Sequence, residues 1–104
     1  MNRITLLIKD WAASSQPRPV TKEMTIKLTS RDVGRIRALT EMFPSRTQEH
    51  IVSDLLATAL EEIEAALPYI PGKKVITEDE FGEPVYEDIG MTPKFEALAK
   101  KYTL

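Results

Sequence analysis

Apolar and polar residues alternate strictly over residues 24–29 (MTIKLT). In a β-strand, the apolar positions would share one face: Met24, Ile26 and Leu28. The opposite face would carry Thr25, Lys27 and Thr29. β-branched threonine suits the solvent face of a strand. A lone strand cannot form a stable sheet, so we expect this one to pair with the same strand of a second copy of the chain.

Helical periodicity follows the predicted strand directly. The first helix is expected over residues 31–42, where apolar side chains recur every three to four positions: Val33, Ile36, Leu39 and Met42. Thr29 or Ser30 is the expected N-cap, with Asp32 in the first turn. Pro44 disfavours helical backbone in the residue before it, so the helix should end there.

A second and longer helix is expected over residues 47–67, with Ser45 or Thr47 as its N-cap. Its main apolar stripe, with the positions beside it, is Ile51, Leu55, Ala59, Ile63 and Leu67, with Val52, Leu56 and Leu60. This apolar face is wider than one amphipathic helix usually needs. It suits a helix that packs on its own first helix and also across a dimer interface.

The remaining patterns predict three peripheral elements. Residues 1–14 have helical spacing of Ile4, Leu7, Ile8 and Trp11, and a proline-containing linker follows. Residues 74–78 and 83–87 flank a turn and predict a short hairpin. Residues 93–102 predict a closing helix with proline in its first turn.

These elements divide the chain into three expected parts. Residues 1–20 form an N-terminal segment and linker, 21–67 the strand and two helices, and 68–104 a hairpin and helix appendage. The predicted fold class is mainly α with a short β-strand, arranged as an intertwined homodimer with a C-terminal β-hairpin and short helix.

Composition excludes several classes of function. The chain of 104 residues has no cysteine and a single histidine, His50, which argues against metal sites and Ser-His-Asp catalysis. No nucleophile–base pair or phosphate-binding glycine loop is apparent, so we expect a non-enzyme without cofactor or metal. The acidic hairpin lacks calcium-loop spacing. The apolar run at residues 4–8 is too short for a secretory signal, which predicts a cytoplasmic protein with no membrane partner.

Charge is distributed unevenly along the chain. Residues 1–47 carry nine Lys/Arg and four Asp/Glu, a net charge of +5, whereas residues 48–104 carry five and twelve, a net of −7. The asymmetry suggests a basic working face and an acidic appendage, although scatter in a small chain could also produce it.

Residues 24–67 resemble the ribbon-helix-helix family of Arc- and MetJ-like repressors and antitoxins. The resemblance lies in the alternating strand, its direct run into a helix of about 12 residues, and the Ser45-Arg46-Thr47 turn before a long apolar helix. It implies a homodimer whose paired strands lie in the major groove of double-stranded DNA, with Thr25, Lys27 and Thr29 reading bases. It also implies that Ser45, Arg46 and Thr47 bind phosphate, while Lys22 and Arg31 could add phosphate contacts.

The leading hypothesis is therefore a dimeric, sequence-specific transcriptional regulator. One alternative is an antitoxin-like protein that binds a protein partner through residues 68–104 and represses its own operator. The whole chain also looks similar to bacterial proteins labelled type 1 pili tip component, which suggests a pilus-associated structural role; the lack of a signal peptide and of cysteines argues against it. The strand could also be half-buried with no role in DNA binding.

Overall fold

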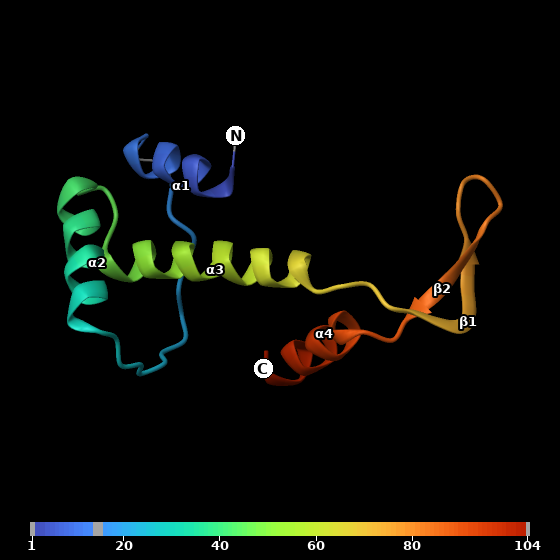
Figure 1. Cartoon of the computed structure of the whole chain (residues 1–104). Helices are drawn as coiled ribbons and strands as arrows, with labels where there is room; N and C mark the ends of the chain where they lie inside the picture. The colour runs from blue at the N-terminus through green and yellow to red at the C-terminus, as the bar shows by residue number, and fades with distance from the viewer. Residues whose placement is uncertain (1, 14–15, 104) are drawn as a thin grey trace. The chain divides into compact units, whose positions relative to one another are not determined.

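The computed structural model describes residues 2–13 and 16–103, and the chain divides into two compact units, Met1–Leu60 and Glu61–Leu104 (Figure 1). Helices and one antiparallel sheet make up the described part. In chain order the elements are α1 (Arg3–Ala12), α2 (Ser30–Met42), α3 (Gln48–Ala66), β1 (Pro71–Glu78), β2 (Pro84–Asp88) and α4 (Met91–Tyr102).

Helix α2 confirms the first predicted helix to within one residue. Thr29 is its N-cap: the backbone is extended, with φ −68° and ψ 155°, and the side-chain Oγ1 accepts a hydrogen bond from the backbone N–H of Asp32 at 3.2 Å. At the other end the N–H of Phe43 donates to the carbonyl of Leu39 at 3.0 Å, immediately before Pro44. Of the two N-caps considered, the structure selects Thr29 over Ser30.

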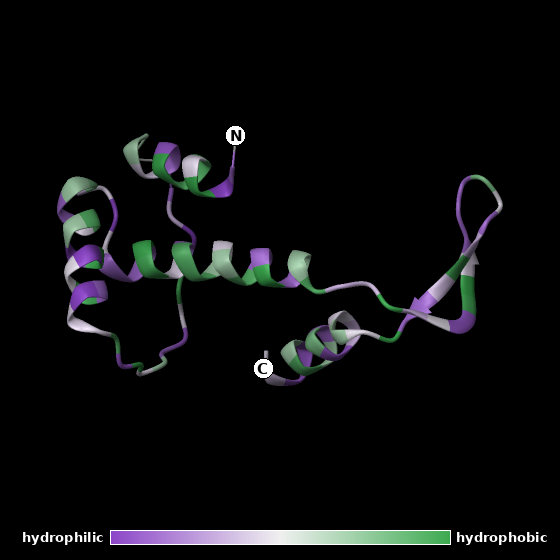
Figure 2. Cartoon of the chain, in the orientation of Figure 1, coloured by the Kyte–Doolittle hydropathy of each residue, from purple (hydrophilic) through white to green (hydrophobic). Residues whose placement is uncertain are grey.

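Helix α3 confirms the second predicted helix and selects Thr47 as its N-cap. The hydroxyl of Thr47 accepts a hydrogen bond from the backbone N–H of His50 at 3.2 Å. Ile51 is completely buried, and Asp54 and Thr58 lie on the same buried face. Further along, the apolar side chains of the predicted stripe and its flank are about half exposed: Leu56, Leu60 and Ile63. Hydrophobic residues recur along the whole helix (Figure 2).

Residues 24–29 do not form the predicted strand within the single chain. Among the described residues, the only sheet pairs β1 with β2. The backbone N–H and C=O groups of a strand need a neighbouring strand to complete the ladder, and this chain places none beside residues 24–29. The apolar face of the segment is left open to solvent: Met24 is 85% exposed, Ile26 50% and Leu28 46%.

The unit Glu61–Leu104 confirms the predicted hairpin and closing helix. Strands β1 and β2 are antiparallel, with Val75 opposite Tyr86. The turn between them is closed by Asp79, whose Oδ1 accepts hydrogen bonds from the N–H groups of Phe81 and Glu83, both at 2.9 Å. Gly82 adopts a left-handed φ of 79°, which glycine tolerates without strain. Helix α4 starts two residues earlier than predicted.

The N-terminal segment confirms the expected helix in the form of α1. Its N-cap is Asn2, whose side-chain oxygen accepts a hydrogen bond from the N–H of Thr5 at 2.8 Å. Trp11 is 2% exposed and its ring lies against that of Phe43, with centroids 5.6 Å apart. The last turn of α1 therefore packs on the turn that joins α2 to α3.

Candidate nucleic-acid interface

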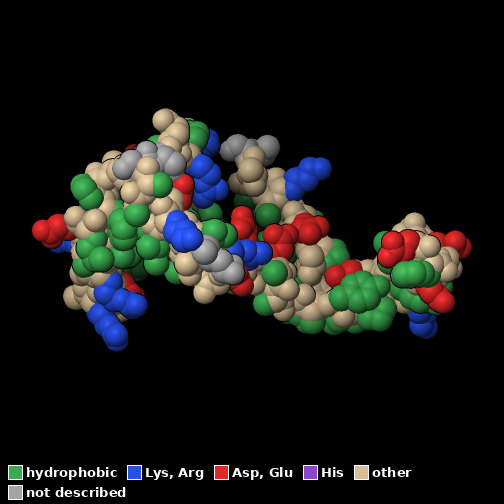
Figure 3. Space-filling model, turned by 90° about the horizontal axis from the view of Figure 1, so that it is seen from above, with side chains coloured by type: hydrophobic (Ala, Val, Ile, Leu, Met, Phe, Trp, Pro, Cys, Tyr) green, Lys and Arg blue, Asp and Glu red, His purple; other side chains and the backbone are tan. Residues whose placement is uncertain are grey.

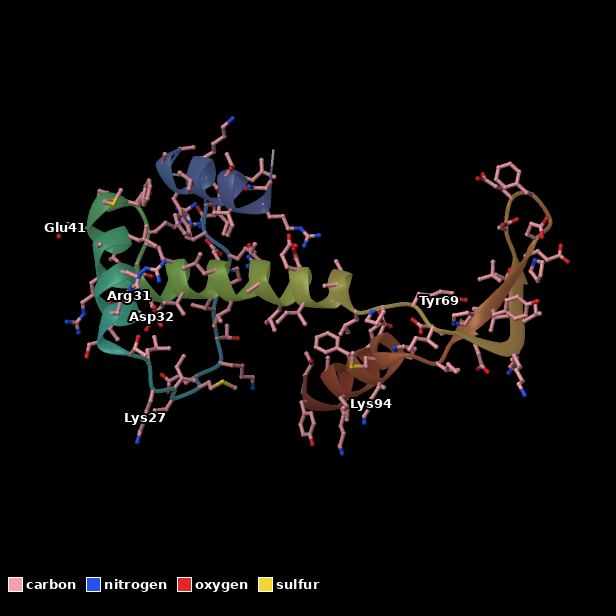
Figure 4. The ribbon with its side chains drawn as sticks, in the orientation of Figure 1. Lys27, Arg31, Asp32, Glu41, Tyr69 and Lys94 are labelled. Atoms are coloured by element: carbon pink, nitrogen blue, oxygen red, sulfur yellow. The ribbon has the colours of Figure 1, made fainter. Side chains whose placement is uncertain are left out.

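The residues expected to read bases lie on an exposed segment outside the helices and the sheet. Thr25, Lys27 and Thr29 are all exposed, and Lys27 extends away from the main chain into solvent (Figure 4). The hydroxyl of Thr29 already accepts the capping hydrogen bond from Asp32, but its own O–H remains able to donate. The structure therefore leaves the side chains of this segment accessible to a ligand.

Lys22 and Arg31, which were expected to contact phosphate, flank this segment. Both are exposed, and Arg31 lies in the first turn of α2 (Figure 4). One turn later, Arg35 forms an exposed ion pair with Asp32, with Nη1 and Oδ1 separated by 3.4 Å. Lys and Arg side chains and hydrophobic side chains both lie at the surface in the space-filling view (Figure 3). In the segment itself, Lys27 is exposed, and so are Met24, Ile26 and Leu28, so the segment combines cationic and apolar surface.

Ser45 and Arg46, also expected to bind phosphate, are instead engaged by α1. The hydroxyl of Ser45 donates to the backbone carbonyl of Trp11 at 2.9 Å. The guanidinium of Arg46 donates from Nη2 to Oδ2 of Asp10 at 3.4 Å, and the Arg46 side chain is only 1% exposed. A phosphate contact requires a guanidinium at the surface, so Arg46 is left out of the proposed interface.

Thr47, the third member of the expected phosphate group, is exposed at the start of α3. Besides capping the helix, its Oγ1 lies 2.7 Å from Nδ1 of His50. The hydroxyl is therefore already used within its own helix. Of the three residues of the turn, Arg46 is buried, Ser45 is hydrogen-bonded to α1, and Thr47 is hydrogen-bonded within its own helix.

A buried polar cluster around Asp54 was not predicted from the sequence. We call it the Asp54 junction, formed by Trp11, Arg18 and Asp54. The Trp11 Nε1 donates to Asp54 Oδ2 at 3.0 Å, and the Arg18 Nη2 donates to Asp54 Oδ1 at 3.5 Å. Asp54 is 8% exposed. The signal available in the sequence was an acidic residue three positions after Ile51, on the same face of a helix.

The remaining chemistry of the described chain is limited. Within residues 2–13 and 16–103, no group of three potential metal-binding side chains comes together. In the same residues, none of the helices combines the length and the apolar character needed to cross a lipid bilayer. In comparisons with family models, curated proteins and solved structures, no match to the chain was found.

Proposed function

We propose that the protein is a homodimeric DNA-binding transcriptional regulator. Residues 24–29, which we call the ribbon segment, pair with their copy in a second chain to form a two-stranded ribbon that enters the major groove. The observation that carries this proposal is an alternating segment that is exposed, belongs to neither a helix nor the sheet in the single chain, and runs directly into the N-cap of α2.

Exposed apolar side chains support the homodimer. The apolar side chains of the ribbon segment, Met24, Ile26 and Leu28, are about half exposed or more. Three apolar side chains in the later part of α3 are also about half exposed: Leu56, Leu60 and Ile63. Full burial of one such side chain contributes roughly 1.5–3 kcal/mol. A second copy that covers these positions would therefore gain several such contributions, together with the backbone hydrogen bonds of the ribbon.

The outward side chains are chemically suited to base edges. Lys27 can donate to guanine O6 or N7, and the hydroxyls of Thr25 and Thr29 can donate or accept, with methyl groups that can contact thymine. Lys22 and Arg31 supply cations near the ends of the segment, where they can contact phosphates without reading sequence.

Selection from a random duplex library with purified full-length protein tests the proposed function. Because a two-fold symmetric dimer presents the same ribbon twice, the enriched motif should be an inverted repeat. Binding should be measured at a fixed salt concentration near 150 mM, since phosphate contacts make affinity strongly salt-dependent. Recovery of no enriched motif, with a dimeric protein in the assay, would contradict sequence-specific reading.

A second candidate function is supported by the unit Glu61–Leu104. It is compact by itself, and it exposes many apolar side chains: Tyr69, Ile70, Val75, Ile76, Phe81 and Tyr86. A two-stranded hairpin is only marginally stable in water, so contact with another surface would favour it. We propose that an antitoxin-like protein would use this unit to bind its partner. Co-purification of a second protein, lost when residues 68–104 are removed, would favour this function.

A further inference from the structure

Asp54 fastens the chain to α3 at two points. Its Oδ2 accepts the hydrogen bond of the Trp11 indole at 3.0 Å, and its Oδ1 pairs with the Arg18 guanidinium at 3.5 Å. Trp11 is the last buried residue of α1, whereas Arg18 lies on the extended chain that leads to the ribbon segment. One buried carboxylate thus holds the chain at two points: in the last turn of α1, and within the connection between α1 and the ribbon segment.

The far end of the ribbon segment is also held, by hydrogen bonds at the start of α2. Thr29 caps α2 through its side chain, and its carbonyl accepts the first hydrogen bond of the helix from the N–H of Val33 at 3.0 Å. The chain from Arg18 to Thr29 therefore begins on α3 and ends on α2. In Figure 1 it leaves α3 and turns back to the start of α2. The ribbon segment belongs to a span held at both ends rather than to a free arm.

Holding both ends lowers the entropic cost of forming the ribbon. Fixing the backbone of each residue costs conformational entropy, and a chain already held at its ends has fewer conformations to lose. Preorganisation of this kind strengthens association without adding contacts. The residues that supply it need not touch the second copy or the DNA.

We propose that Asp54 is a positioning residue for the ribbon segment, acting through Arg18 and Trp11. The Arg18 contact is the part that concerns the ribbon, since it lies between α1 and the segment. This proposal rests on the proposed dimer and its DNA-reading ribbon. It assigns a role to an acidic side chain that is buried within the single chain.

The central test is Arg18→Gln, made in the full-length chain and compared with Asp54→Asn and the double variant. Arg18 has a side chain that is 64% exposed, so the ion pair contributes little to folding. We expect the dimer dissociation constant to rise about two- to fivefold for Arg18→Gln. For Asp54→Asn the expected rise is about tenfold. The double variant should match Asp54→Asn, because both changes remove the same contact.

Asp32→Asn is the matched control. This substitution also removes one carboxylate and breaks the exposed ion pair between Asp32 and Arg35, whose atoms are 3.4 Å apart. Unlike Asp54, Asp32 does not bind Trp11 or Arg18. The dimer dissociation constant of this variant should stay within about twofold of wild type. Trypsin provides a second readout: cleavage after Lys22 and Lys27 should be faster in Arg18→Gln than in Asp32→Asn. Helix content, from circular dichroism, should be the same in both.

The outcomes separate this proposal from the proposed function. If Arg18→Gln dimerises and resists trypsin as wild type does, Asp54 serves only to hold α1, and the positioning role is wrong. If the variants weaken the dimer as expected but the wild type enriches no DNA motif, the positioning role stands and DNA reading fails. A wild type that is monomeric overturns both.

Discussion

Lys27 is the residue for which the structure and the proposed chemistry agree most directly. Its side chain is exposed and extends from the ribbon segment (Figure 4). Among the described residues, it forms no ion pair. Lys27→Ala should lower affinity for the selected duplex by about 1–3 kcal/mol and leave the free energy of unfolding unchanged. A fluorescence titration at fixed salt measures the first, and urea unfolding the second.

Lys22→Ala is the control for that prediction. Because we propose that Lys22 contacts phosphate, its removal should weaken binding to all duplexes similarly and reduce the salt slope by about one. Equal binding of every duplex by wild type and Lys27→Ala alike would show that the ribbon segment does not read sequence.

Arg46 illustrates how burial changes the expected effect of a substitution. Because its guanidinium is buried and paired with Asp10, Arg46→Ala should remove packing as well as charge. We expect a loss of about 1–3 kcal/mol in the free energy of unfolding. Arg37→Ala, at an exposed position of α2, is the matched control and should change stability by less than about 0.5 kcal/mol. Urea unfolding of both variants tests whether Arg46 has a structural role. If Arg46→Ala leaves stability unchanged, Arg46 is again a candidate phosphate-binding residue.

At the scale of elements, we expect dimerisation and DNA binding to use opposite faces of the ribbon segment. Ile26 lies on the apolar face that we expect to be buried between two chains, and Thr25 lies on the opposite face, which we propose turns toward DNA. Ile26→Lys should abolish the dimer by placing an unpaired charge in its core, whereas Thr25→Lys should preserve it. Sedimentation of the two variants measures this. The reverse result would mean that the strands pair with a register shifted by one residue.

The helices around that segment rest on local interactions. Thr29 and Thr47 cap α2 and α3. In each case the backbone N–H three residues later donates a hydrogen bond to the threonine hydroxyl. The strand that should precede α2 has no such local support. Its hydrogen bonds lie across a ladder, so the element exists only where a second strand is present.

For the whole molecule, we predict a homodimer at micromolar concentration. Among the described residues of the unit Met1–Leu60, the buried apolar side chains are Trp11 and Ile51, while the apolar ribbon face and part of α3 stay exposed. A unit of this size buries little surface by itself, so folding should be coupled to association. Light scattering should give about twice the chain mass of 11.8 kDa, and a folded monomer would contradict the prediction.

The two compact units should also divide the work. Residues 68–104 carry five Lys/Arg and seven Asp/Glu, a net charge that repels phosphate. A chain ending at Leu67 keeps all of α3. It should remain dimeric and bind the selected duplex with equal or higher affinity, while losing any partner protein. Loss of DNA binding with the dimer intact would show that the second unit supports the ribbon.

The sequence alone determined the helices and the hairpin, because their signals are local. Apolar spacing, N-cap residues and Pro44 located α2 and α3 to within about a turn, and a turn between two short strands located the hairpin. Local pattern could not choose between Ser45 and Thr47 as the cap of α3. That choice depended on the contact of Ser45 with Trp11, which is 34 residues away in sequence.

Only the tertiary structure decided the Asp54 junction and the burial of Arg46. Trp11 and Asp54 are separated by 43 residues, and nothing in the pattern around either one specifies the other. Arg46 and Asp10 are separated by 36. Both pairs form because α1 packs on the turn between α2 and α3, which brings Trp11, Asp54 and Arg46 out of water, where each needs a partner. The single chain does not show the ribbon segment as a strand, because the strand that we propose needs a second chain for its hydrogen bonds.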